Sequence, residues 1–215
     1  MTPAPITSRR AFTLVELLAV IAIIGVLSGI TLVVVGRTHA KAFDARCLSM
    51  QRQLGVSVQL YAFDNQNRFP GPCYAGVRKG YSTKSSDSSF FGFIAPYAGL
   101  VSDDKWRNAD ALVCPAWSRD VINADQAPVY MLSDSVTLSD GTTVNPWGYP
   151  SKSMPIRINQ IANPASTWLL KDIDQKNASA NASWYASLPP DPVHGNGKTR
   201  NTLFGDYSVR SVPTD

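Results

Sequence analysis

The sequence lacks the motifs that most catalytic sites and nucleic-acid interfaces need. It has no H-E-x-x-H zinc motif, no glycine-rich phosphate-binding loop and no nucleophile–base pattern. It has 20 basic and 16 acidic residues, a net charge of +4, and no run of Lys and Arg that would mark a nucleic-acid footprint. We therefore expect a protein that is not an enzyme, needs no catalytic cofactor and binds no nucleic acid.

Cysteine is scarce, with only Cys47, Cys73 and Cys114 in the chain. No two of them have the C-x-x-C spacing of a metal or redox pair. If most of the chain lies outside the cytoplasm, one disulfide can form and one thiol is left over. Cys73 and Cys114 both lie beside prolines in loop-like sequence, which favours that pair. The alternative is three unpaired cysteines.

One long apolar stretch dominates the N-terminal part of the chain. No charged residue occurs from Leu17 to Val35, and Phe12–Val15 extends the stretch with a break only at Glu16. At about 1.5 Å per residue a helix of this length crosses a hydrocarbon core of about 30 Å. Arg9 and Arg10 precede it, so the positive-inside rule predicts a cytoplasmic N-terminus and export of the rest.

Three simpler interpretations compete with a functional membrane helix. A secretory signal peptide has a shorter apolar region followed by a small-residue cleavage site, for which Thr38–Ala40 is a weak candidate. A plain single-span anchor is the second, and a buried core helix is the third, although such a helix usually keeps a polar face. Glu16 favours the functional membrane helix over these three interpretations. An ionisable group in a membrane span costs about 3 kcal/mol near its centre, so its presence marks a candidate functional residue.

The segment Arg10-Ala11-Phe12-Thr13-Leu14-Val15-Glu16-Leu17-Leu18 resembles the prepilin peptidase motif of type IV pilins and type II secretion pseudopilins. The resemblance implies that prepilin peptidase cuts between Ala11 and Phe12, that Phe12 becomes N-methylated, and that Glu16 acts in assembly with other subunits. The family usually has Gly before the cut, and this chain keeps a small residue there. Many pilins also have a kinking Pro where Val33 stands.

After Val35 the helical pattern becomes amphipathic. Apolar residues recur at steps of three and four at Phe43, Cys47, Met50, Leu54, Val58 and Tyr61. The opposite face is predicted from Lys41, Asp44, Arg46, Gln51, Arg52 and Gln59. The helix is expected to end near residues 64–67, before the Pro- and Gly-rich residues 69–72.

The C-terminal half has the pattern of a β-rich head. β-prone runs occur at 129–132, 136–138, 142–144, 167–170 and 201–204, and Asp140-Gly141 marks a hairpin. We predict an α+β fold in which a long N-terminal helix packs on an antiparallel sheet. The predicted parts are a leader (1–11), a transmembrane and assembly helix (12–35), an amphipathic helix (36–66) and a globular head (67–215).

Acidic residues and a histidine gather in the last third. Asp172 and Asp174 follow a predicted strand, and the run from His194 to Asp206 resembles the C-terminal tail of a pilin-like subgroup with an H-x9-D-G pattern, although Tyr207 stands where Gly would be. If the strands are neighbours, the three carboxylates would suit Ca²⁺, with His194 hydrogen-bonding a carboxylate or a backbone group. The alternative is loop residues that make turns.

Two functions of different classes follow. The first is a structural subunit of a type IV pilus or type II secretion pseudopilus, held in the bacterial inner membrane by a single pass with a periplasmic head. The second is a membrane-tethered periplasmic domain that binds a glycan or another polymer. The aromatic residues that motivate the second are Trp147, Tyr149, Trp184 and Tyr185, although most of them are expected in the core.

Overall fold

The computed structural model describes residues 13–84 and 87–214 of the chain. Contacts divide the chain into two units, Met1–Ala42 and Phe43–Asp215, and each is described by itself. Helix α1 (Leu14–Asp64) belongs to the first unit by its N-terminal part and to the second by its C-terminal part.

Among the described side chains of α1 in the first unit, none is buried. The 18-residue stretch Leu14–Thr31 is long and apolar enough to cross a membrane, and none of it is buried. Large apolar side chains are exposed on every side of this stretch, for example Leu14, Leu18, Ile23 and Val26. A helix that is apolar all round is stable only in an apolar solvent or against other apolar surfaces.

In the second unit α1 buries the predicted apolar stripe. Cys47, Leu54 and Val58 are fully buried, and Phe43 at the start of the stripe is partly exposed. Gln51 was predicted on the polar face, but its side chain is 1% exposed. The helix ends at Asp64, within the predicted region.

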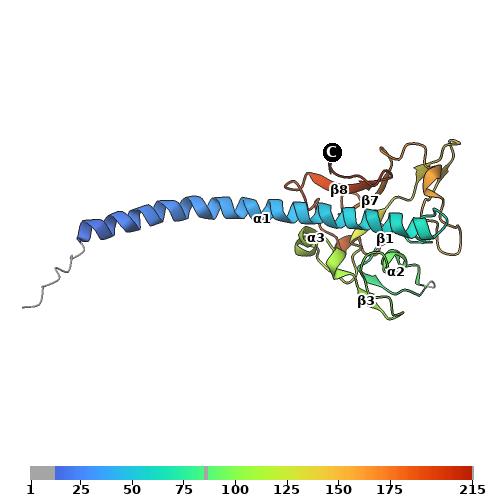
Figure 1. The fold of residues 1–215 in the computed structure, drawn as a ribbon, viewed down its shortest axis with the longest axis horizontal. Helices are drawn as coiled ribbons and strands as arrows, with labels where there is room; N and C mark the ends of the chain where they lie inside the picture. The colour runs from blue at the N-terminus through green and yellow to red at the C-terminus, as the bar shows by residue number, and fades with distance from the viewer. Residues whose placement is uncertain (1–12, 85–86, 215) are drawn as a thin grey trace, which may run out of the picture. The chain divides into compact units, whose positions relative to one another are not determined.

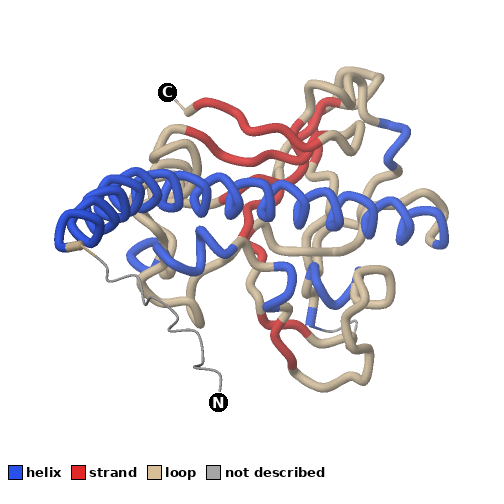
Figure 2. The backbone as a smooth tube through the Cα atoms, turned by 60° about the vertical axis from the view of Figure 1, so that its left-hand side comes forward, coloured by secondary structure: helices blue, strands red, loops and turns tan. Residues whose placement is uncertain are grey.

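The head contains one main antiparallel sheet. In the described residues its five strands have the order β1-β4-β7-β8-β9. Their bounds are β1 (Gly76–Val77), β4 (Tyr130–Leu132), β7 (Trp168–Asp172), β8 (Thr199–Phe204) and β9 (Val209–Pro213). β7 and β8 lie beside the C-terminal part of α1 (Figures 1 and 2), where a Cβ at Gly55 would lie 2.8 Å from Cδ1 of Leu203. The predicted α+β fold is confirmed.

Smaller elements complete the head. Two short strand pairs are β2 (Gly80–Tyr81) with β3 (Arg107–Asn108), and β5 (Val136–Thr137) with β6 (Thr143–Val144). The β5–β6 turn is the predicted hairpin, and Gly141 adopts the positive φ of 84° that this turn needs. The short helices are α2 (Phe90–Ile94), η2 (Asp110–Leu112), α3 (Pro115–Asp120), η3 (Ile158–Gln160) and η4 (Tyr185–Ser187).

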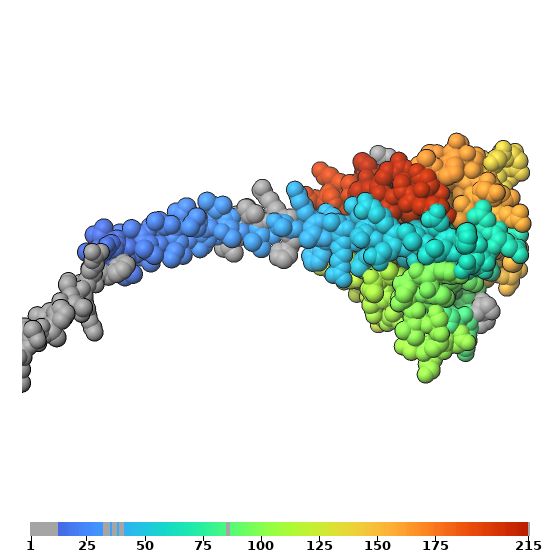
Figure 3. Space-filling model, viewed as in Figure 1, coloured from blue at the N-terminus to red at the C-terminus, as the bar shows by residue number. Residues whose placement is uncertain are grey.

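The C-terminal part of α1 lies between the sheet and the segment that carries α2 and α3, as the space-filling view shows (Figure 3). On the α2 side, the rings of Tyr61 and Phe93 meet edge to face at 6.2 Å. The Ser57 hydroxyl lies 3.4 Å from the Tyr97 carbonyl oxygen. α1 is therefore the central layer of the head, and its buried face is covered from two sides.

The disulfide joins Cys47 and Cys114, and Cys73 is a free, buried thiol. The predicted Cys73–Cys114 pair is therefore wrong, while one disulfide with one thiol left over matches the expectation. Cys47 lies on the buried stripe of α1, and Cys114 is the N-cap residue of α3. The Cα atoms of the two cysteines are 4.9 Å apart. Cys73 instead contacts the Pro70 carbonyl oxygen at 3.6 Å within its own loop. The packing of α1 against the start of α3 thus decides the pairing, and proximity to proline does not.

Reduction of this disulfide is expected to lower the free energy of unfolding by about 2–4 kcal/mol, because the bond closes a long loop in the unfolded chain. Its two cysteines are 67 residues apart. Urea unfolding of the full chain in detergent, with and without reductant, measures the change. Cys73→Ala is the control and should keep the reductant effect. Peptide mapping that links Cys73 to Cys114 would contradict the assignment.

Candidate functional site

The first turn of α1 and a buried polar cluster in the head each bring polar side chains together. The predicted cleavage residues Ala11 and Phe12 lie outside the described residues. The described part begins at Thr13, directly before α1.

Thr13 and Glu16 form a reciprocal cap at the start of α1. The Thr13 backbone N–H and hydroxyl both donate to Glu16 Oε2 at 2.9 Å, and the Glu16 N–H donates to Thr13 Oγ1 at 3.2 Å. A carboxylate in the first turn also interacts favourably with the helix dipole. Both residues are exposed. The cap holds Glu16 in the first turn and leaves its carboxylate accessible to a cation from outside.

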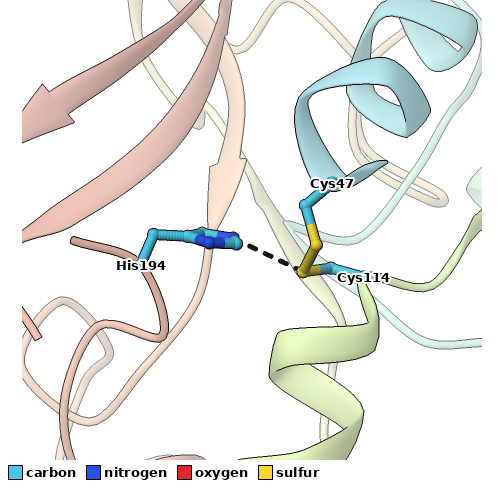
Figure 4. A group of neighbouring side chains, drawn as sticks. All are labelled: Cys47, Cys114 and His194. Carbon is cyan, nitrogen blue, oxygen red and sulfur yellow. Dashed lines mark hydrogen bonds between the residues drawn. A yellow bond between two sulfur atoms is a disulfide. The ribbon is translucent and has the colours of Figure 1, made fainter. Parts of the chain in front are cut away.

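His194 lies at the centre of the buried cluster. Its side chain is 1% exposed, and Nδ1 lies 2.6 Å from Asp44 Oδ1 on α1. An ionised carboxylate only accepts, so Nδ1–H donates to Asp44. Nε2 lies 3.4 Å from Sγ of Cys114 and 3.4 Å from Oδ2 of Asp172 (Figure 4 shows the histidine facing the disulfide).

Asp172, at the end of β7, is fully inside the head. Its carboxylate accepts from Gln51 Nε2 at 2.7 Å and from the Asn201 backbone N–H at 2.8 Å. Burial raises the pKa of Asp172 to about 6, against the opposing effects of His194 and of these two hydrogen bonds. The carboxylate therefore joins α1, β7 and β8 through polar contacts inside an apolar core.

Asp174 and Asp206 lie in other surroundings. Arg200 donates from Nε and Nη2 to both carboxylate oxygens of the buried Asp174, at 2.5 and 2.8 Å. Asp206 lies in the β8–β9 turn and accepts from the backbone and hydroxyl of Ser208. Asp172 instead meets the N-terminal half of β8, so the strand separates it from Asp206.

Of the four residues predicted to converge, the structure brings Asp172 and His194 together, and Asp174 lies near enough for its charge to act on Asp172 while it pairs with Arg200. The predicted gathering of Asp172, Asp174 and Asp206 at one end of the sheet is corrected, because Asp206 follows the opposite end of β8. Binding of Ca²⁺ by the head stays a prediction.

The disulfide sulfurs and His194 form a group whose ligand atoms lie within 4.8 Å of one another. Metal ions bind cysteine as thiolate, and two sulfurs joined to each other offer none. In this oxidised form the group fastens three elements: α1 by Cys47, α3 by Cys114, and the loop before β8 by His194. The buried cluster thus holds these three parts of the head together.

Sequence reasoning missed Asp44 and Gln51 as members of this cluster. Both were predicted on the exposed face of the helix. The spacing does contain a signal, because Asp44 and Gln51 lie three residues before and four residues after Cys47, on its side of the helix. Of the two, Gln51 is buried, whereas the Asp44 side chain stays 43% exposed and reaches His194 from the edge of the stripe.

Comparison with known proteins finds one match. Residues 6–32 match the family model described as the prokaryotic N-terminal methylation motif. This segment includes Ala11, Phe12 and Glu16, and the match supports the resemblance to type IV pilins and pseudopilins. No curated protein and no solved structure matches the chain.

The Asp172 carboxylate is expected to make stability depend on pH. Burial raises the pKa from 3.8 to about 6, so the folded state binds the proton more tightly than the unfolded state. The stabilisation by protonated Asp172 is therefore fully present below pH 3.8 and is lost as the pH rises through about 6. From pH 7 to 4, we expect wild type to gain about 1–3 kcal/mol relative to Asp172→Asn.

Urea unfolding of both full chains at several pH values, followed by tryptophan fluorescence, measures this difference. Asp206→Asn is a matched control, because Asp206 is an exposed carboxylate in the turn at the far end of β8. Its substitution should leave the gain from pH 7 to 4 in place. A wild type and Asp172→Asn that keep a constant difference across this range would contradict the prediction.

Proposed function

We propose that this chain, which carries the N-terminal methylation motif of type IV pilins and pseudopilins, is a structural subunit of a pilus-like or pseudopilus filament. In this proposal, prepilin peptidase removes residues 1–11 and Phe12 becomes the methylated N-terminus. The mature chain crosses the bacterial inner membrane once, with its head in the periplasm, until it joins other subunits. It acts by assembly and not by catalysis.

The observation that carries the proposal is the exposed apolar surface of α1 over Leu14–Thr31. Burial of apolar surface is worth about 25 cal/mol per Å², so this stretch requires lipid or other apolar surfaces around it. A helix that leaves the bilayer keeps its surface covered only if neighbouring helices replace the lipid. A bundle of such helices supports a filament of many subunits.

Glu16 supplies the specificity that an apolar helix lacks. A charge inside a span costs about 3 kcal/mol near its centre, which a partner cation offsets. The cut before Phe12 creates an amine, and the Phe12 amine of a neighbouring subunit is the proposed partner. The reciprocal cap with Thr13 keeps the Glu16 carboxylate in the first turn, where such an amine can reach it.

The head fits an extracytoplasmic setting. Its disulfide closes between α1 and α3, and such bonds persist in oxidising compartments such as the periplasm. The methylation motif is common to pili and secretion pseudopili, so both assemblies agree with the proposal. The adjacent genes would assign the chain to one of them.

Processing has a direct readout. Mass analysis of the purified mature protein should show Phe12 as the first residue, carrying one extra methyl group. A chain that starts at Met1, or one that starts beyond Gly36, would rule out prepilin processing. Co-expression with and without prepilin peptidase separates enzymatic cleavage from chance proteolysis.

Glu16→Ala is expected to block incorporation into filaments while membrane insertion stays intact, because the substitution removes the charge and keeps the apolar span. Crosslinking between subunits and sheared-filament fractions measure incorporation, and carbonate extraction measures insertion. Ser28→Ala, which removes a polar group from the same exposed helix, is the matched control and should assemble normally. Normal assembly of Glu16→Ala would favour a simple membrane tether.

A further inference from the structure

A hollow of about 740 Å³ opens on the head, lined by residues of β1, β2 and β3 and by the segment that contains Trp184. Its volume lies in the range of small-ligand sites, about 300–1,000 Å³. None of its lining residues belongs to the buried His194 cluster or to α1. The assembly proposal therefore leaves this hollow without a role.

Two tryptophans flank the hollow, and each lies against a glycine. A Cβ at Gly80 on β2 would lie 2.6 Å from Cζ2 of Trp106, and a Cβ at Gly76 on β1 would lie 3.7 Å from Cζ2 of Trp184. Trp106 is nevertheless 67% exposed. The missing side chain at Gly80 thus lets the Trp106 indole come close to the backbone of β2, while most of the residue stays exposed to a ligand.

A third aromatic ring borders the hollow. Tyr74 is 53% exposed and is held edge to face by Tyr149 at 5.4 Å. Large aromatic side chains with few rotatable bonds provide contact area at a low cost in conformational entropy. Of the aromatic residues singled out from the sequence, Trp184 lines the hollow. Tyr149 contacts the hollow-lining Tyr74. Trp147 instead is buried against Phe69 and Phe90.

The charged residues of the lining balance. Arg78 and Lys79 contribute two positive charges, and Asp87 and Asp125 contribute two negative charges. Lys79 and Asp125 also pair with each other at 2.8 Å. A site for a polyanion would carry an excess of cations. The balance therefore favours a neutral ligand that is rich in hydrogen-bonding groups.

We propose that this hollow binds a neutral hexopyranose chain. The apolar C–H face of a sugar ring packs on an indole, and its hydroxyls both donate and accept. Asn108, Lys79 and Asp125 offer donors and acceptors at the same site. A peptide that adds a strand needs a longer edge than β1 and β2 present, because each of these strands has two residues.

This binding goes beyond the proposed assembly and is independent of it. All residues of the hollow lie between Tyr74 and Trp184 in the head, whereas assembly was argued from Thr13, Glu16 and the apolar stretch of α1. A chain with Glu16→Ala should therefore bind the sugar with unchanged affinity. A Trp106→Ala chain should assemble normally.

Titration calorimetry on the full chain in detergent tests the proposal with four neutral probes: cellohexaose, hexa-N-acetylchitohexaose, mannohexaose and maltohexaose. At least one should bind at millimolar concentration or below. Trp106→Ala is expected to weaken that binding at least tenfold. Gly80→Ala should weaken it as well, because the added Cβ displaces the indole. Unchanged thermal melting shows that each variant is folded.

Trp168→Ala is the matched control. Trp168 lies on β7 with the Lys171 amine 4.1 Å from its ring centroid, and it does not line the hollow, so its substitution should leave the affinity unchanged. Absence of binding by all four probes would overturn the proposal. So would full affinity in folded Trp106→Ala, or a polyanion such as dextran sulfate binding at this site more tightly than every neutral probe.

Discussion

The buried face of α1 between Cys47 and Ala62 is the surface on which the rest of the head depends. Each neighbouring element reaches this face by a different kind of contact. Cys47 bonds to Cys114 at α3, Gln51 donates to Asp172 at the end of β7, and the bare backbone at Gly55 admits Leu203 of β8. Because the strands and short helices of the head are small, few of them could bury enough apolar area without this common partner.

The two parts of α1 present different surfaces. Its N-terminal stretch, Leu14–Thr31, is apolar on all sides, whereas the part from Phe43 onward has one apolar face covered by the head. Continuous helical backbone carries both, since intrahelical hydrogen bonds satisfy its polar groups in lipid and in water alike. One element can therefore serve as a membrane anchor, as a candidate assembly surface and as the central layer of a head.

Polar groups in the head are separated by their surroundings into two kinds. Asp172, His194 and Asp174 lie in the core, and each has charged or hydrogen-bonding partners there. Burial of such a group without a partner would cost several kcal/mol of folding free energy. Their partners therefore hold specific elements of the head against one another. The polar groups around Trp106 are accessible instead, balanced in charge and arranged around exposed aromatic rings. The buried set stabilises the head, and the accessible set is the one that a ligand can reach.

The sequence by itself determined the features that depend on neighbouring residues: the apolar span, the Glu16 position, the amphipathic stripe with its end near Asp64, the hairpin at Gly141 and most strands of the sheet. These follow from local periodicity and turn chemistry, and the fold class followed from them. The tertiary structure alone decided which cysteine pairs with Cys114, that Gln51 is buried, that Asp206 lies away from Asp172, and that Trp106 and Trp184 flank one hollow. Each of these depends on contacts between residues far apart in the chain, because strand register and helix packing set those distances. Of these features, helical spacing indicates the side of α1 on which Gln51 lies, but not the carboxylate that it meets there.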